Sequence, residues 1–256
     1  MSKPLVVVTR RLPDVIETRM MELFECRLNL EDKPLTQSEL IEAAREAEVL
    51  VPTVTDRIDA GVLSQAGPKL KLIASFGTGV DHIDLKTARQ RGITVTNTPG
   101  VLTDTTADLA FSLMVSAARR ICEADRFLRA GRWQQWEIDM MTGHDIHGQT
   151  LGIYGLGRIG QGMARRASGF DMRVIYHDAV RATAEQEEAW GVEYVDREVL
   201  FRESDFLSSH VPLTEQTRHA VGKDELALMK SNAVLVNPSR GPVVDESAWA
   251  DALEKG

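Results

Sequence analysis

Cysteines and long apolar runs are scarce in this sequence, and its 30 basic residues are outnumbered by 38 acidic ones. Its two cysteines, Cys26 and Cys122, are too few for a disulfide framework and suit the reducing environment of the cytoplasm. No apolar run approaches the length that spans a membrane, and the first residues lead into a short apolar segment instead of a signal peptide. The formal net charge of −8 disfavours nucleic acid and anionic membranes as partners. The composition therefore indicates a soluble cytoplasmic protein.

Short β-branched runs alternate with helical patterns along the chain. The segments predicted to form strands are 5–9, 49–54, 70–75, 93–96, 151–154, 173–176, 206–211 and 233–236. Such alternation is typical of parallel sheets covered by helices on both faces. A chain of 256 residues is also at the size where one core begins to split into two. We therefore predict an α/β fold with two lobes, divided near the turn residues Asn97-Thr98-Pro99-Gly100.

Helix signals are clearest in three places. Thr36 with Glu39 fits a capping box, and Asp59 is a further predicted N-cap. A single long helix is predicted over residues 103–129, with Thr103 as its N-cap, because apolar residues recur there at helical spacing. These residues are Ala107, Ala110, Phe111, Met114, Ala118, Ile121 and Leu128. We expect this helix to carry a hinge and a subunit interface.

The most informative motif is the turn Gly155-Leu156-Gly157-Arg158-Ile159-Gly160, which lies between a predicted strand and a helix. Gly155 permits a tight turn, Gly157 lets the backbone approach a pyrophosphate, and Gly160 allows close packing of helix on strand. Asp178, at the end of the next predicted strand, is placed to bind ribose hydroxyls. The motif predicts a dinucleotide site. The alternative, a glycine-rich loop that merely turns, leaves Asp178 at a strand end by coincidence.

The same aspartate bears on the choice of cofactor. A carboxylate accepts hydrogen bonds from ribose hydroxyls but repels a 2′-phosphate, so Asp178 favours NAD over NADP. Arg181 lies close by in the sequence and would reverse this preference if it faced the phosphate.

Three further segments are ambiguous by themselves. Gly77 and Gly79 follow a predicted strand, where backbone N–H groups can bind a carboxylate, although an ordinary strand-to-helix turn has the same pattern. Arg240 also follows a predicted strand and offers a planar fork to a substrate carboxylate, with a surface ion pair as the alternative. His144 and His147 form a loose pair in a loop with no evident third ligand, so no metal is expected.

Several segments, in the same order along the chain, resemble the D-isomer-specific 2-hydroxyacid dehydrogenases, and most closely their glyoxylate/hydroxypyruvate reductase branch. The matching segments are 77–84, 103–108, 131–133, 147–152, 155–160, 210–214 and 237–241. The resemblance implies a flavodoxin-like substrate lobe over residues 1–99 and a Rossmann dinucleotide-binding lobe over residues 100–256 that is incomplete at its C-terminus. It implies hydride transfer between the nicotinamide of NAD, with NADP as an option, and a small 2-keto or D-2-hydroxy acid, in a homodimer.

The resemblance also implies the roles of individual residues. The implied substrate contacts are Val54, Thr78, Gly79 and Arg240, and Arg240 is in addition the implied catalytic residue. The implied cofactor contacts are Thr105, Gly155, Leu156, Gly157, Arg158, Ile159, Gly160, Asp178, Val211, Pro212, Thr217, Asn237, Pro238 and Ser239.

The family's acid/base histidine and its partner glutamate lie beyond the arginine in the family pattern. None of the six histidines, His82 and His210 included, matches that position before the sequence stops at Gly256. Two hypotheses follow. One is a dehydrogenase whose C-terminal part is absent from this sequence, so that residues 1–256 by themselves are inactive. The other is a noncatalytic dinucleotide-binding or interaction protein, and the length of the open reading frame distinguishes the two.

Overall fold

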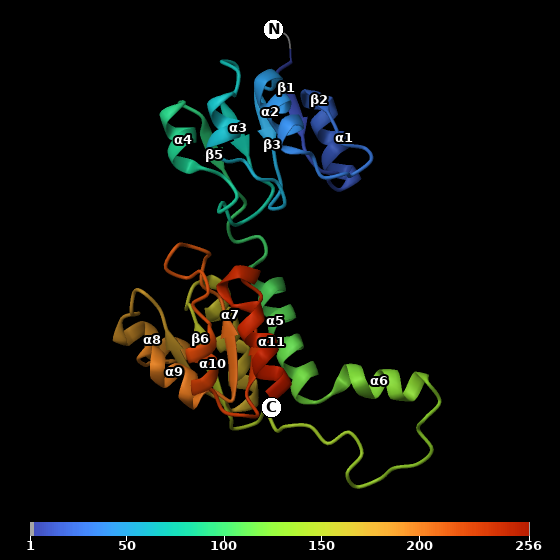
Figure 1. Ribbon diagram of the computed structural model, residues 1–256, viewed down its shortest axis with the longest axis vertical. Coiled ribbons are helices and arrows are strands. Elements are labelled where there is room, and N and C mark those ends of the chain that lie inside the picture. The colour runs from blue at the N-terminus through green and yellow to red at the C-terminus, as the bar shows by residue number, and fades with distance from the viewer. Residues whose placement is uncertain (1–2, 256) are drawn as a thin grey trace. The chain divides into compact units, whose positions relative to one another are not determined.

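The structure, a computed structural model, describes residues 3–255 and consists of two compact units, Met1–Val101 and Leu102–Gly256 (Figure 1). Each unit is built around a single parallel sheet that is buried on both faces. The predicted α/β class is confirmed. No helix between residues 3 and 255 is long and apolar enough to cross a membrane.

The first unit has the strand order β2-β1-β3-β4-β5, which is the flavodoxin-like order predicted for it. Its strands are β1 (Leu5–Val8), β2 (Glu25–Arg27), β3 (Val49–Val51), β4 (Leu72–Ala74) and β5 (Thr94–Thr96). Its helices are α1 (Asp14–Leu23), α2 (Gln37–Glu46), α3 (Ala60–Ser64) and α4 (Leu85–Gln90). Successive side chains of a strand point to opposite faces, so Val7 packs in one core cluster while Val6 and Val8 pack in the other.

The second unit has the order β10-β9-β6-β7-β8, in which β6, the first strand of the sheet, lies between β7 and β9. This is the predicted Rossmann arrangement, whose ligands bind at the carboxyl ends of the strands where the order reverses. Its strands are β6 (Thr150–Tyr154), β7 (Arg173–His177), β8 (Glu193–Tyr194), β9 (Phe206–Ser209) and β10 (Val234–Val236). Its helices are α5 (Thr103–Ala118), α6 (Ile121–Arg129), α7 (Arg158–Ala167), α8 (Ala184–Trp190), α9 (Arg197–Glu203), α10 (Lys223–Leu228) and α11 (Glu246–Lys255), with short 3₁₀ turns at Ser168–Phe170 and Gly241–Val243.

The local capping signals at Thr36 and Asp59 are confirmed. The backbone N–H of Thr36 donates to the Glu39 carboxylate at 2.7 Å, and the N–H of Glu39 donates back to the Thr36 hydroxyl at 3.4 Å. The Asp59 carboxylate accepts from the N–H of Val62 at 3.1 Å. These side chains thus supply acceptors for backbone N–H groups at the start of each helix, which have no acceptor within the helix.

The prediction of one helix over residues 103–129 is wrong. The helix ends after Ala118, because Arg120 adopts the left-handed conformation with φ +52°, and α6 starts at Ile121. Thr103 is not the N-cap either, since that position is taken by Leu102 without a side-chain hydrogen bond. Apolar spacing continues across the break and so conceals it. The structure separates the two parts by burial: α5 buries one face, whereas α6 buries none of its residues.

The predicted strands are shortened at their ends, and two strands were missed. The missed strands β2 and β8 lie at sheet edges, are only three and two residues long, and are largely exposed, so they carry no apolar run. The shorter strands matter more for function than the missed ones do, because they place two predicted site residues in loops. Val54 lies in the loop after β3, and Val211 lies in the loop after β9. Both residues therefore belong to the ends of parallel strands, where ligands bind.

Candidate active site

The glycine turn after β6 is tightly constrained at two of its three glycines. Gly155 has φ +96°, and a Cβ at this position would lie 2.8 Å from the backbone nitrogen of Val211. A Cβ at Gly160 would lie 2.4 Å from the carbonyl oxygen of Gly155. Gly157 differs, because a Cβ there would meet no atom within 4 Å. Gly155 and Gly160 are required by the protein's own packing, whereas Gly157 leaves open space above the turn.

The open space at Gly157 lies at the amino end of helix α7. Gly157 is the N-cap of α7 and, having no side chain, provides no side-chain cap. The first N–H groups of a helix have no acceptor within it, and the helix dipole places partial positive charge there. Such an end binds a phosphate group well. The geometry of residues 155–160 therefore fits the pyrophosphate of a dinucleotide.

Asp178 is fixed against the same turn. Its carboxylate accepts from the backbone N–H of Leu156 at 2.7 Å and from that of Val180 at 3.3 Å. The N–H of Gly155 donates to the carbonyl of His177 at 2.8 Å, which holds the end of β7 beside the turn. Carboxylate oxygens have further lone pairs, so Asp178 can still accept hydrogen bonds from a ribose.

The loop after β9 supplies the next side of the turn. Val211 is buried, and its backbone lies directly under Gly155. Pro212 is exposed beside it. The hydroxyl of Thr217 donates to the carbonyl of Pro212 at 2.5 Å and accepts from the N–H of Thr214 at 2.8 Å. Thr217 thus stabilises the conformation of this loop from within.

The segment after β10 is held by its own side chains. Asn237 donates from Nδ2 to the carbonyl of Arg240 at 2.8 Å, and Ser239 donates from its hydroxyl to Oδ1 of Asn237 at 2.6 Å. Arg240 is extended, with φ −142°, and Nη1 donates to the carbonyl of Ser239 at 2.9 Å. Since β10 is parallel to β9 and β6, Pro238 and its neighbours lie at the same sheet edge as the glycine turn.

Thr105 lies on α5 and not in a loop at the strand ends. It is exposed in the first turn of the helix, where its hydroxyl donates to the carbonyl of Leu102 at 3.2 Å. The same end of α5 packs closely on α7, because a Cβ at Gly162 would lie 2.8 Å from Cβ of Ala107. Arg166 adds ion pairs from α7 to Asp104 and Asp108.

In the first unit, the loops after β3, β4 and β5 come together. Phe76 donates its N–H to the carbonyl of Pro52 at 2.8 Å, and a Cβ at Gly77 would lie 2.8 Å from Cγ1 of Val54. Asn97 donates from Nδ2 to the carbonyl of Thr78 at 2.7 Å. Val54 therefore lies beside the loop that contains Thr78 and Gly79, a proximity that their separation in the sequence conceals.

His210, at the end of β9, is held as a neutral base. Its Nε2 lies 2.9 Å from the hydroxyl of Ser208, and burial lowers the pKa of His210 to about 4. The buried Nδ1 has no hydrogen-bond partner. An imidazole with so low a pKa is neutral near pH 7, so the imidazolium form that would act as an acid is not populated there.

This burial predicts a stability that depends on pH. Because the folded pKa of about 4 lies below the unfolded value of 6.5, the unfolded state binds more protons between these values. We expect the free energy of unfolding to fall by up to about 3 kcal/mol as the pH drops through this range. His210→Gln should reduce the fall and His144→Gln, at an exposed site, should not, as measured by urea unfolding at several pH values. Equal slopes for wild type and His210→Gln would contradict the assignment.

The partners of Arg181 near the end of β7 were missed in the sequence. Arg181 and Glu187 form a two-pronged ion pair, and Glu187 also accepts from the buried hydroxyl of Tyr176 at 2.8 Å. Nothing in the sequence sets Glu187 apart from its exposed neighbours Glu185 and Glu188. Only its burial does, since 13% of the Glu187 side chain is exposed.

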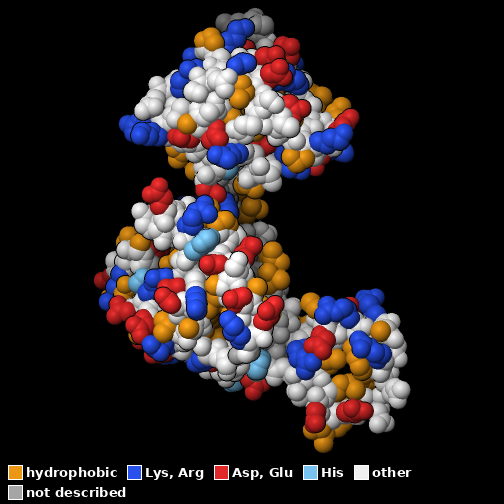
Figure 2. Space-filling view, viewed as in Figure 1, with side chains coloured by type: hydrophobic (Ala, Val, Ile, Leu, Met, Phe, Trp, Pro, Cys, Tyr) orange, Lys and Arg blue, Asp and Glu red, His pale blue; other side chains and the backbone are white. Residues whose placement is uncertain are grey.

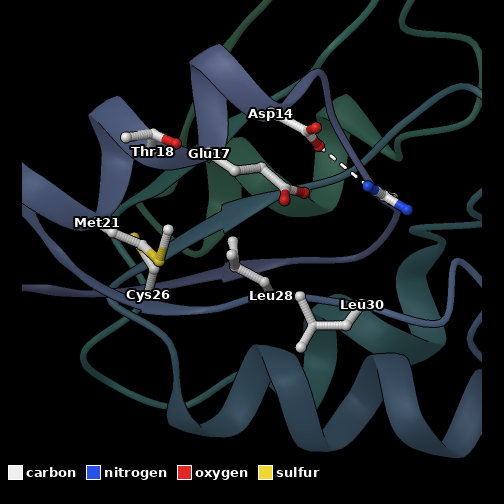
Figure 3. A pocket seen from close by; sticks show the side chains of 8 residues that line it. Asp14, Glu17, Thr18, Met21, Cys26, Leu28 and Leu30 are labelled. Atoms are coloured by element: carbon white, nitrogen blue, oxygen red, sulfur yellow. Dashed lines mark hydrogen bonds and ion pairs between the residues drawn. The ribbon is translucent and has the colours of Figure 1, made fainter.

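The first unit also has an open hollow of about 610 Å³ between α1 and β2, which the sequence did not predict (Figure 3). Met21, Cys26, Leu28 and Leu30 form its apolar part, and the ion pair between Arg11 and Asp14, at 3.1 Å, lies at its edge. The hollow contains none of the predicted site residues. Within residues 3–255, no cluster of His, Cys, Asp and Glu side chains has the makeup of a metal site.

Comparison with known proteins gives this arrangement a family. A family model described as "D-isomer specific 2-hydroxyacid dehydrogenase, NAD binding domain" matches residues 111–256. A glyoxylate reductase of Korarchaeum cryptofilum is 50% identical over 99% of this chain and 76% of that protein. A solved glyoxylate reductase from Paecilomyes thermophila superposes with a TM-score of 0.85 at 30% identity, over 100% of this chain and 79% of that one. A Polaromonas structure titled as a D-isomer specific 2-hydroxyacid dehydrogenase superposes with a TM-score of 0.89 at 37% identity, over 99% and 79%.

The chain belongs to the D-isomer-specific 2-hydroxyacid dehydrogenases. It is an NAD-dependent oxidoreductase of small 2-keto and 2-hydroxy acids, and the noncatalytic alternative is not favoured. The predicted family, reaction class and cofactor are confirmed.

Proposed function

We propose that the protein reduces glyoxylate with NADH. The observation that carries this proposal is the 50% identity to a glyoxylate reductase across 99% of the chain, joined to a glycine turn and an Asp178 that fit a dinucleotide. Hydroxypyruvate, which adds a hydroxymethyl group to the same 2-keto acid, is the second substrate we propose.

The proposed substrate contacts are Arg240, Thr78, Gly79 and Val54. Arg240 binds the substrate carboxylate and polarises its carbonyl through a planar guanidinium. The backbone N–H groups of Thr78 and Gly79 provide the second contact to the carboxylate, and Val54 forms an apolar wall. Bound NADH supplies the hydride.

The proposed cofactor site follows the carboxyl edge of the second sheet. Leu156, Gly157, Arg158 and Ile159 bind the pyrophosphate, supported by the packing of Gly155 and Gly160. Thr105, Val211, Pro212 and Thr217 line the groove, and Asn237, Pro238 and Ser239 lie by the nicotinamide. Asp178 binds the adenosine ribose. Support comes from the position of the glycine turn, Asp178, Val211 and residues 237–239 at the ends of the parallel strands.

The activity is tested by NADH oxidation with the natural full-length enzyme. We expect turnover with glyoxylate and with hydroxypyruvate, followed by the loss of NADH absorbance, and little turnover with 2-keto acids that have bulky side chains. An enzyme that turned over bulky 2-keto acids but not glyoxylate would contradict the proposed substrate.

We expect tighter binding of NADH than of NADPH. A 2′-phosphate placed about 4 Å from the Asp178 carboxylate would cost of order 4 kcal/mol at an effective dielectric constant near 20. Titration of both reduced cofactors, followed by their fluorescence, gives the two Kd values directly. A lower Kd for NADPH would overturn the preference.

We further propose a homodimer that forms through α5 and the arm of residues 121–142. The arm carries exposed apolar side chains, and orange surface is visible over it in Figure 2. Its exposed large apolar residues include Ile121, Leu128, Trp133, Trp136 and Ile138. Trp136 and Ile138 are 75% and 79% exposed. Exposed indoles and aliphatic side chains that lie together are typical of interfaces.

The expected molecular mass by light scattering at micromolar concentration is that of a dimer. Trp133→Ser with Trp136→Ser should shift the equilibrium toward the monomer, because both remove aromatic anchors. Phe24→Ser, which removes an exposed aromatic residue of the first unit, is the control and should leave the mass unchanged. A monomeric wild type would rule out the proposal.

We also propose a cytoplasmic location. Its support is that both cysteines are free, with Cys26 partly buried and Cys122 exposed, which suits a reducing compartment.

A further inference from the structure

The loop between β7 and α8 contains a cation whose position bears on cofactor choice. In a Rossmann fold, the residues that follow the acidic end of the second strand flank the adenosine ribose, and an arginine there accommodates a 2′-phosphate. Here the acidic residue is Asp178, and Arg181 lies in the loop that follows. The charge that NADPH would need is therefore present in the right loop, next to the charge that repels it.

One edge of the Arg181 guanidinium is already engaged. Its Nε donates to Oε1 of Glu187 at 2.9 Å, and its Nη2 donates to Oε2 at 2.9 Å. Its Cζ also lies 5.1 Å from the ring centre of Tyr194, in a cation–π contact. This is the two-pronged geometry by which a guanidinium binds a phosphate, so the Nε–Nη2 edge of the fork is occupied by Glu187.

Glu187 is itself held in place by the core. Tyr176 is fully buried, and its hydroxyl donates to Oε1 of Glu187 at 2.8 Å. The same hydroxyl accepts from the N–H of Ala182 at 2.9 Å, which ties the loop to the strand. Hydrogen bonds from Arg181 and Tyr176 hold the pKa of Glu187 below its usual range, so the carboxylate is charged at neutral pH.

We propose that Glu187 is a specificity-determining positioning residue, which holds Arg181 on the ring of Tyr194 and so denies a 2′-phosphate its cationic partner. A 2′-phosphate then meets Asp178 with no compensating cation. Glu187 touches no cofactor atom in this proposal, because it acts through Arg181. The inference rests on the NADH preference proposed above, and it adds a second cause for that preference besides the charge of Asp178.

The test is a set of cofactor titrations with the full-length enzyme, followed by the fluorescence of NADH and NADPH. Glu187→Gln keeps the size of the side chain and an oxygen that accepts from Tyr176, but it removes the charge that holds Arg181. We expect it to lower the Kd for NADPH about ten-fold and to change the Kd for NADH by less than about two-fold. Glu188→Gln removes the same charge from an exposed position on the same helix and should change neither value.

Two further variants show whether the gain passes through Arg181. Adding Arg181→Gln to Glu187→Gln should return the Kd for NADPH to the wild-type value. Arg181→Gln alone should leave that Kd within about two-fold of wild type, because Arg181 does not contact the phosphate while Glu187 holds it. Glu187→Asp, which restores the charge, should return the preference toward NADH. A merely structural role of Glu187 would weaken binding of both cofactors and would show no such dependence on Arg181.

The outcomes separate this inference from the proposed function. A wild type that binds NADPH more tightly than NADH overturns the NADH preference. An unchanged Kd for NADPH in a folded Glu187→Gln enzyme overturns the role of Glu187 and leaves the preference intact. If Glu187→Gln does not fold, Arg181→Gln alone still decides, since a selective loss of NADPH binding would show that Arg181 already reaches the phosphate.

Discussion

Arg240→Lys is expected to lower kcat/KM for glyoxylate by about 100-fold in the full-length enzyme while it leaves the Kd for NADH within about two-fold. Lysine keeps the charge but loses the planar fork that binds a carboxylate with two parallel hydrogen bonds, and a charge-assisted hydrogen bond contributes about 1.5–3 kcal/mol. The loop that presents Arg240 is held by Asn237 and Ser239, so the substitution changes the head group and not the backbone.

Steady-state kinetics and an NADH titration measure the two quantities separately. Arg202→Lys is the matched control, because Arg202 is exposed on α9 in the same unit and lies outside the proposed site. It should change neither value. An unchanged kcat/KM in Arg240→Lys would remove Arg240 from the substrate site, and a large loss of NADH binding would make it a cofactor residue instead.

Two alanine substitutions in the glycine turn are expected to affect different properties. Gly160→Ala should lower stability, whereas Gly157→Ala should weaken the binding of NADH. Gly160→Ala should lower the free energy of unfolding by about 2–3 kcal/mol, because its Cβ would lie 2.4 Å from the carbonyl oxygen of Gly155 and neither backbone can yield easily. The gain of about 1 kcal/mol that alanine brings to a helix is too small to offset this clash. Gly157→Ala should leave stability unchanged, because its Cβ meets no protein atom within 4 Å.

Gly157→Ala should weaken the binding of NADH although it leaves stability unchanged. Its methyl group would stand where the pyrophosphate approaches the backbone, so we expect the Kd for NADH to rise more than about ten-fold. Urea unfolding and NADH titration measure the two effects. Gly169→Ala, in an open position outside the turn, is the control for both. Normal NADH binding by Gly157→Ala would show that the cofactor does not approach this turn.

Local sequence patterns were sufficient for much of the fold. The apolar strands alternate with helices closely enough that both sheets and their parallel class follow from periodicity, and Thr36 and Asp59 mark helix starts through hydrogen bonds within a few residues. The glycine turn could be read for the same reason, because Gly155 and Gly160 contact each other within one turn. Edge strands β2 and β8 escaped, since exposed strands of two or three residues have no core-facing pattern.

The candidate site likewise has a part that local sequence patterns predicted and a part that they did not. Strand ends and glycine spacing placed Asp178 and Arg240 at the carboxyl edge of one sheet, because parallel strands bring distant loops together at that edge. Contacts between distant residues could not be read in this way. The packing of Val54 on Gly77 and the buried, neutral state of His210 depend on three-dimensional proximity and on exclusion of water.

The chain's periodicity and turn residues determined the α/β class, the two sheets and the dinucleotide turn, because these features arise from interactions between near neighbours. The tertiary structure alone decided that the helix breaks at Arg120 and that Glu187, among several glutamates on one helix, meets Arg181 and Tyr176. A charged side chain looks the same in the sequence whether it is solvated or held. Burial beside a particular strand makes the difference.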